Sequence, residues 1–110
     1  MSETGSILVV DDVPQNIRLL EAVLTPRGHT VLSATSGAEA LERLAGTPDV
    51  DLVLLDIVMP EMDGYAVCRA LREDPATRFL PVVMITASGR SEKLASIDAG
   101  ADDFVAKPFD

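Results

Sequence analysis

Five polar side chains that could do chemistry close or follow short apolar runs of this chain. They are three carboxylates, one hydroxyl and one ammonium group: Asp11, Asp12, Asp56, Thr86 and Lys107. Carboxylate oxygens without His or Cys favour a hard divalent cation, of which Mg²⁺ fits best because it also keeps water and phosphate oxygens as ligands. The lysine adds a positive charge that suits an anion. A cation, an anion and a carboxylate nucleophile together indicate phosphoryl transfer to an aspartate.

Each of these residues also has an ordinary structural explanation. Asp56 could simply stabilise a loop, since Asp is common in turns. Asp11 and Asp12 could be solvated or could cap the following helix. As a set, the residues could reduce to an ion pair between Lys107 and one acid. That explanation does not account for polar residues that recur at strand ends, so a shared site is the better interpretation.

The apolar runs predict five strands, at residues 7–10, 30–34, 52–55, 81–86 and 104–106. The run at 52–55 is apolar throughout, which is typical of a strand buried on both faces. The run at 30–34 alternates in part and is expected nearer an edge of the sheet. Helical patterns separate the strands, which favours a parallel sheet in a βα-repeat fold. The carboxyl ends of such strands meet at one edge, where ligands bind.

The helical segments are predicted from their start signals and apolar spacing. The segment Ser36 to Glu39 fits a capping box. The inner face of the helix that follows is predicted to hold Ala38, Leu41, Leu44 and Ala45. The helix before Gly100 has a weaker apolar stripe, formed by Leu94 and Ile97. His29, the only histidine, is expected in a turn without a partner.

Composition excludes several classes of function. The chain has 110 residues, a size typical of one domain, and a formal net charge of −9 without a basic cluster, so direct nucleic-acid binding is not expected. Its single cysteine, Cys68, cannot form an internal disulfide and is predicted to pack in the core rather than act as a nucleophile. No apolar run approaches a membrane span, and no signal peptide is recognisable. A soluble cytoplasmic module is expected.

Several motifs together resemble the receiver domain of two-component response regulators, the CheY-like superfamily. They are Asp11-Asp12, Asp56 followed by Met59-Pro60 and Asp63-Gly64, Thr86-Ala87, and Lys107-Pro108-Phe109. The resemblance runs from Ile7 to Phe109. It implies a flavodoxin-like, doubly wound sheet of five parallel strands in the order 2-1-3-4-5. The fifth, C-terminal helix of the family is absent from this chain. We therefore expect residues 1–110 to form a single receiver domain that is a fragment of a longer protein.

The resemblance also implies a role for each motif residue. Asp56 is the phosphate acceptor, and Asp11, Asp12, Asp56 and the backbone carbonyl of Val58 bind Mg²⁺. Lys107 contacts the phosphoryl group and is followed by a cis bond to Pro108. Thr86 is the switch hydroxyl, and Phe104 matches the switch aromatic residue.

The implied function is a phosphorylation-activated switch in a phosphorelay. A histidine kinase or phosphotransfer protein is the expected phosphoryl donor, and the surface of the fourth helix and fifth strand signals to an output domain. The segments 12–20 and 66–69 resemble receivers attached to nucleotide cyclases or hybrid kinases. A homodimer is a further expected partner, and no membrane is involved.

Other functions remain as alternatives. One is a receiver-like interaction module that works without phosphorylation. Another is a phosphatase with an aspartate nucleophile, but such enzymes usually carry a second Asp two residues later, where this chain has Val58. Enzymatic activity is therefore expected only as self-phosphorylation and dephosphorylation.

Overall fold

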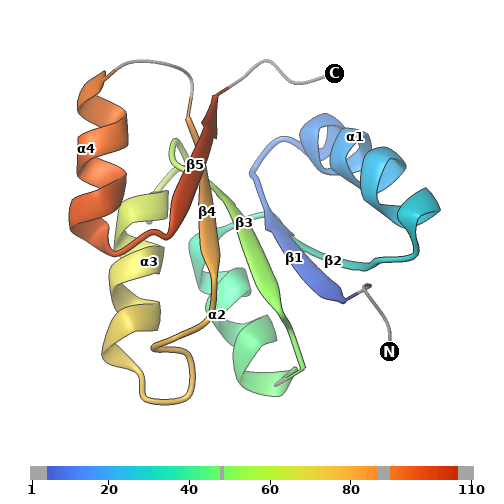
Figure 1. The fold of residues 1–110 in the computed structure, drawn as a ribbon, viewed down its shortest axis with the longest axis horizontal. Coiled ribbons are helices and arrows are strands. Elements are labelled where there is room, and N and C mark those ends of the chain that lie inside the picture. The colour runs from blue at the N-terminus through green and yellow to red at the C-terminus, as the bar shows by residue number, and fades with distance from the viewer. Residues whose placement is uncertain (1–4, 48, 87–89, 107–110) are drawn as a thin grey trace.

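Five short runs rich in Val, Ile and Leu form one sheet in the computed structural model, which describes residues 5–47, 49–86 and 90–106. The strands are β1 (Ser6–Val10), β2 (Thr30–Ala34), β3 (Leu52–Asp56), β4 (Val82–Thr86) and β5 (Asp103–Ala106). Their order is β2-β1-β3-β4-β5 and all neighbouring pairs are parallel (Figure 1). The predicted flavodoxin-like topology and the edge position of β2 are both confirmed.

Helices cover both faces of this sheet (Figure 1). They are α1 (Pro14–Leu24), which continues into a 3₁₀ turn (Thr25–Arg27), α2 (Gly37–Gly46), α3 (Gly64–Glu73) and α4 (Arg90–Ala99). Side chains alternate across a strand, so Ile7 and Val9 of β1 pack with Ile17 of α1. Leu8 and Val10 point the other way and join a larger cluster with residues of α2, α3 and α4. Among the described helices, α1 therefore covers one face of the sheet, and α2, α3 and α4 cover the other face.

The start of α2 shows a modified capping box. The Ser36 hydroxyl accepts a hydrogen bond from the Glu39 amide at 3.1 Å, as the sequence predicts. The Glu39 carboxylate accepts from the backbone amide of Thr35 at 2.6 Å and from its hydroxyl at 3.1 Å, rather than from Ser36. The backbone donor at Thr35, followed by its hydroxyl, lowers the pKa of Glu39.

The predicted inner face of α2 is right for Leu41 and Leu44, which pack in the core, and wrong for the other two residues. Ala38 and Ala45 are exposed, and the buried residues are Gly37, Ala40 and Leu44. The reason is a close approach at the first residue of the helix. A Cβ atom on Gly37 would lie 2.8 Å from both Met62 Sδ and Val67 Cγ2. The missing side chain lets the helix rest on Gly37, and this contact sets its rotation.

The predicted stripe of α4 is also wrong. Leu94 and Ile97 are 58% and 57% exposed, whereas Ser96 and Ala99 are buried. The small side chains of Ser96 and Ala99 let the helix pack closely against its neighbours. The buried Ser96 hydroxyl has a hydrogen-bond partner within the helix, because it donates to the Glu92 carbonyl at 2.8 Å. The two large apolar side chains therefore face outward.

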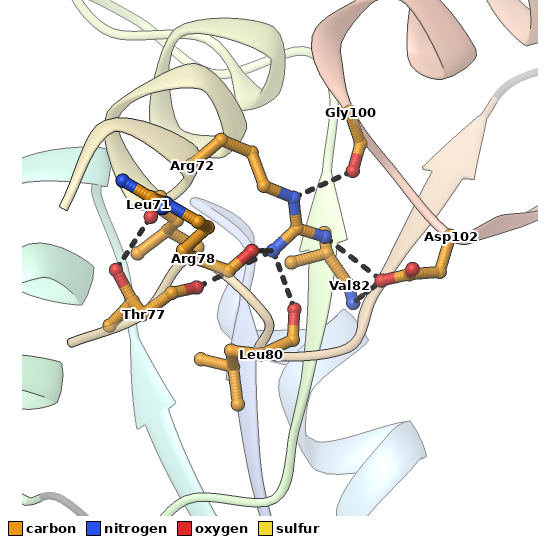
Figure 2. A network of polar contacts seen from close by, with 8 residues as sticks. All are labelled: Leu71, Arg72, Thr77, Arg78, Leu80, Val82, Gly100 and Asp102. Carbon is orange, nitrogen blue, oxygen red and sulfur yellow. Dashed lines mark hydrogen bonds and ion pairs between the residues drawn. The ribbon is translucent and has the colours of Figure 1, made fainter. Parts of the chain in front are cut away.

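Arg72, near the end of α3, joins segments that are distant in sequence (Figure 2). Its Nε donates to the Gly100 carbonyl at 2.8 Å, and one terminal nitrogen donates to the Leu80 carbonyl at 2.7 Å. The other terminal nitrogen pairs with Asp102 Oδ2 at 2.9 Å. That oxygen also accepts from the Val82 amide at 2.8 Å. One guanidinium therefore holds the turn before β4 and the turn between α4 and β5 together.

The start of β1 is held by side chains from two loops. Asp51 Oδ2 accepts from the Ser6 amide at 2.8 Å. His29 Nδ1 accepts from the Gly5 amide at 3.3 Å, so the prediction that this histidine has no partner is wrong. In the part of the chain that the structure describes, no helix is long and apolar enough to cross a membrane.

Candidate functional site

Three carboxylates converge at the carboxyl edge of the two central strands. Asp11 directly follows β1 and Asp56 ends β3, and these strands pair side by side with Val10 opposite Leu55. One carboxylate oxygen from each of Asp11, Asp12 and Asp56 lies within 4.8 Å of the others. Asp11 is fully buried and Asp56 is 4% exposed. Like charges this close repel unless a cation offsets them, so this all-oxygen donor set fits a hard divalent ion such as Mg²⁺.

Asp11 is oriented by groups at the beginning of α1. Its Oδ1 accepts a hydrogen bond from the Val13 amide at 2.9 Å, and its Oδ2 accepts from the Asn16 side-chain amide at 3.0 Å. Sequence reasoning missed Asn16. The available signal was a residue with weak helix propensity in the first turn of a helix, where a local polar contact often explains its presence.

The loop after Asp56 has a constrained backbone. Met59 is 7% exposed and anchors the loop, whereas the Val58 side chain is 66% exposed. Glu61 adopts a φ of 68°, and the Met62 amide donates to the Pro60 carbonyl across it at 2.7 Å. This tight turn is costly for a residue with a side chain, and such strain is common beside functional groups.

Gly64 closes the same loop against the end of β3. Its amide donates to the Ile57 carbonyl at 2.8 Å, and a Cβ atom here would collide with the Asp56 carbonyl oxygen. Asp63 caps α3 by accepting from the Ala66 amide at 2.9 Å. The Asp63-Gly64 pair therefore packs the start of α3 directly against the backbone of Asp56.

Thr86 and Phe104 lie on the neighbouring strands. Ile85 pairs with Asp56, so Thr86 follows at the same edge of the sheet. Thr86 is fully buried, and its hydroxyl oxygen has no hydrogen-bond partner among the residues that the structure describes. Phe104 pairs with Met84 and is partly buried against the larger core cluster.

Two predicted site residues and the cysteine that is predicted to pack in the core remain to be placed. Lys107 and Pro108 lie outside the described residues. Cys68 is fully buried in α3, and burial raises the pKa of its thiol, which agrees with a packing role.

Comparison with known proteins decides which family carries this arrangement. The family described as response regulator receiver domain matches residues 7–110. The chain belongs to this family. Its predicted membership is thus confirmed, and receiver domains of this kind are signalling modules rather than classical enzymes.

Individual relatives agree with this assignment of the receiver domain. Response regulator PleD of Caulobacter vibrioides is 50% identical over 108 residues, which cover 97% of this chain and 24% of PleD. The DNA-binding dual master transcriptional regulator RpaA of Synechocystis is 40% identical, over 94% of this chain and 43% of its own length. The receiver domain spans less than half of either relative.

A solved structure provides an independent comparison of the fold. The signal receiver domain of a signal transduction histidine kinase from Syntrophus aciditrophicus has a TM-score of 0.88 and 39% sequence identity to this receiver domain. The match covers 96% of this chain and 80% of that chain.

Proposed function

We propose that this receiver domain accepts a phosphoryl group on Asp56 from a histidine kinase or phosphotransfer protein. The observation that carries the proposal is the convergence of Asp11, Asp12 and Asp56 carboxylate oxygens within 4.8 Å at the carboxyl edge of the sheet. The Asp56 carboxylate oxygen attacks phosphorus, a P–O bond forms, and the bond from phosphorus to the donor breaks, with its electron pair leaving on the donor. Attack by water later releases phosphate and restores the carboxylate.

The proposed Mg²⁺ ligands are the three carboxylates and the backbone carbonyl of Val58. When bound, the ion offsets negative charge on the transferring group. Asp11 and Asp12 supply carboxylate ligands for the ion, and Asp56 presents the nucleophilic oxygen. Lys107 is proposed to contact the phosphoryl oxygens, with the cis bond to Pro108 directing it there.

The proposed switch begins at Thr86. A phosphoryl group brings strong acceptor oxygens next to a buried hydroxyl without a partner among the described residues. Thr86 donates to one of them, and Phe104 moves into the space that Thr86 leaves. The outer surface of α4 and β5, which includes Leu94, Ile97 and Val105, then changes and is read by a partner. All three side chains are between 46% and 58% exposed, which supports their availability.

The proposed setting is a cytoplasmic protein of which residues 1–110 form one receiver domain. The proposed output is a nucleotide cyclase or a hybrid kinase. The similarity of this chain to the receiver domain of a histidine kinase supports the hybrid kinase. A homodimer is a further proposed assembly. With a net charge of −9, the domain itself is not proposed to bind nucleic acid.

Intact mass after incubation with acetyl phosphate tests this function. We expect a gain of one phosphoryl group that requires Mg²⁺ and is absent in Asp56→Asn. A gain that persists in Asp56→Asn would place the acceptor elsewhere. A folded wild-type protein that gains nothing would instead favour the phosphorylation-independent interaction module.

A further inference from the structure

The two oxygens of the buried Asp11 carboxylate are held by two different donors. The backbone amide of Val13 donates to Oδ1 at 2.9 Å, and the Asn16 side-chain amide donates to Oδ2 at 3.0 Å. A donor on each oxygen fixes the rotation of the carboxylate group. Since Asp11 is fully buried, its orientation decides which lone pairs face Asp12 and Asp56.

Asn16 contacts the same turn through its backbone. It stands in the first turn of α1, and its amide donates to the Val13 carbonyl at 3.0 Å. No side chain caps α1 at Val13. The next residue, Ile17, is 6% exposed and packs on β1, which holds this turn against the strand that carries Asp11. The position of the Asn16 amide is therefore set by the core.

We propose that Asn16 is a positioning residue for cation binding, which orients the Asp11 carboxylate without neutralising it. The inference rests on the proposed function, because it concerns the same Mg²⁺ site. An amide donor adds no positive charge of its own to the site. A Lys or Arg side chain could orient the same oxygen, but its own positive charge would compete with the ion. Partners that orient metal ligands typically affect affinity strongly when they are removed.

The coupling works in both directions. If the Asn16 contact improves ion binding, then ion binding must strengthen the Asn16 contact by the same factor. We therefore expect Mg²⁺ to slow hydrogen exchange of the Asn16 side-chain amide and of the first turn of α1. This local response is a readout that does not depend on phosphorylation.

The test compares the Mg²⁺ dissociation constants of Asn16→Leu and Gln15→Leu, measured on the full chain by isothermal titration calorimetry. Both changes replace an amide by an apolar side chain in the same helical turn. Gln15 is exposed and its side chain makes no hydrogen bond among the described residues, so it serves as a matched control. We expect Asn16→Leu to weaken Mg²⁺ binding about 10-fold, the lower end of such effects, and Gln15→Leu to bind like the wild type.

Conservative and smaller variants keep the test decisive. Asn16→Gln retains the amide and is expected to recover most of the affinity. If Asn16→Leu does not fold, Asn16→Ala carries the same expectation. A folded Asn16→Leu or Asn16→Ala variant that binds Mg²⁺ as tightly as the wild type overturns the positioning role alone. A folded wild type that does not bind Mg²⁺ overturns the proposed metal site itself.

Discussion

The Thr86 hydroxyl is buried without a partner among the described residues, which is an expensive state for a polar group. Replacing it by the similarly shaped Val removes the unsatisfied oxygen. We expect Thr86→Val to raise the free energy of unfolding of the unphosphorylated domain by about 1 kcal/mol. Urea unfolding followed by circular dichroism measures this change. A loss of stability in Thr86→Val would show that the hydroxyl is satisfied in solution.

Thr77→Val is the matched control for this prediction. The Thr77 hydroxyl donates to the Leu71 carbonyl at 2.7 Å, so the same substitution removes a formed hydrogen bond. We expect it to lower the free energy of unfolding by ~1 kcal/mol. The two Thr→Val changes should therefore have opposite signs.

Tyr65 gives a second prediction at the scale of one residue. Its hydroxyl donates to the Glu92 carbonyl at 3.4 Å, and desolvation, followed by the charges of Glu92 and Asp63, raises its pKa. The folded state therefore holds this proton more tightly than the unfolded state. The resulting stability is present below the ordinary pKa of tyrosine and is lost as pH rises through the folded pKa.

This titration can be followed directly, because Tyr65 is the only tyrosine and the chain has no tryptophan. Tyrosinate absorbance should rise at higher pH in the folded domain than in urea. Glu92→Gln should bring the two titrations closer together, since it removes one of the charges. Coincident curves for the folded and unfolded wild type would contradict the prediction.

At the scale of elements, Arg72 fixes the turn that joins α4 to β5. Its side chain is 20% exposed and its donors reach backbone carbonyls on both sides of β4. Arg72→Met keeps much of the apolar stem but leaves those carbonyls without the charged donor. We expect it to lower the free energy of unfolding by about 2–4 kcal/mol. Chemical denaturation measures the loss.

Arg69→Met is the control for Arg72. Arg69 lies on the same helix and is exposed, and its side chain makes no hydrogen bond or ion pair among the described residues. Its replacement should change stability by less than about 0.5 kcal/mol. Equal losses for the two variants would mean that helix charge, rather than the contacts in Figure 2, stabilises the domain.

Element positions were predictable where the signal was local. Apolar runs placed the strands, and Ser36 placed the start of α2. Helix faces were predicted less well. Cys68 of α3 and Leu44 of α2 are buried as expected, but part of the α2 face depends on the close contact of Gly37 with Met62, and α4 buries Ser96 in place of Leu94. The positions of the site carboxylates could be predicted, because each one ends or follows an apolar run that forms a strand. The orientation of Asp11 by Asn16 could not, since weak helix propensity at one position suggests a local polar contact but does not specify its partner.

At the scale of the whole molecule, burial is uneven across the sheet. In β1, residues 7–10 are all 5% exposed or less, whereas Val105 of β5 is 46% exposed. We expect amides of β1 to exchange hydrogen only through global unfolding and those of β5 and α4 through a smaller local opening. Hydrogen exchange followed by NMR measures the free energies of global unfolding and of local opening, under conditions in which each opened segment closes faster than its amides exchange. Equal protection of β1 and β5 would contradict this gradient.

The carboxylate cluster can form only once the two central strands have paired, so its formation can serve as a marker for folding of the sheet. Asp11 directly follows β1 and Asp56 ends the adjacent strand β3, yet α1, β2 and α2 lie between them in the sequence. Parallel neighbours cannot be joined by a hairpin, so the two acids meet only after a long crossover has closed. No shorter segment of the chain can assemble the pair. Cation affinity in this protein therefore reports when the central topology is complete, and a stopped-flow experiment with a metal indicator could time that event during refolding.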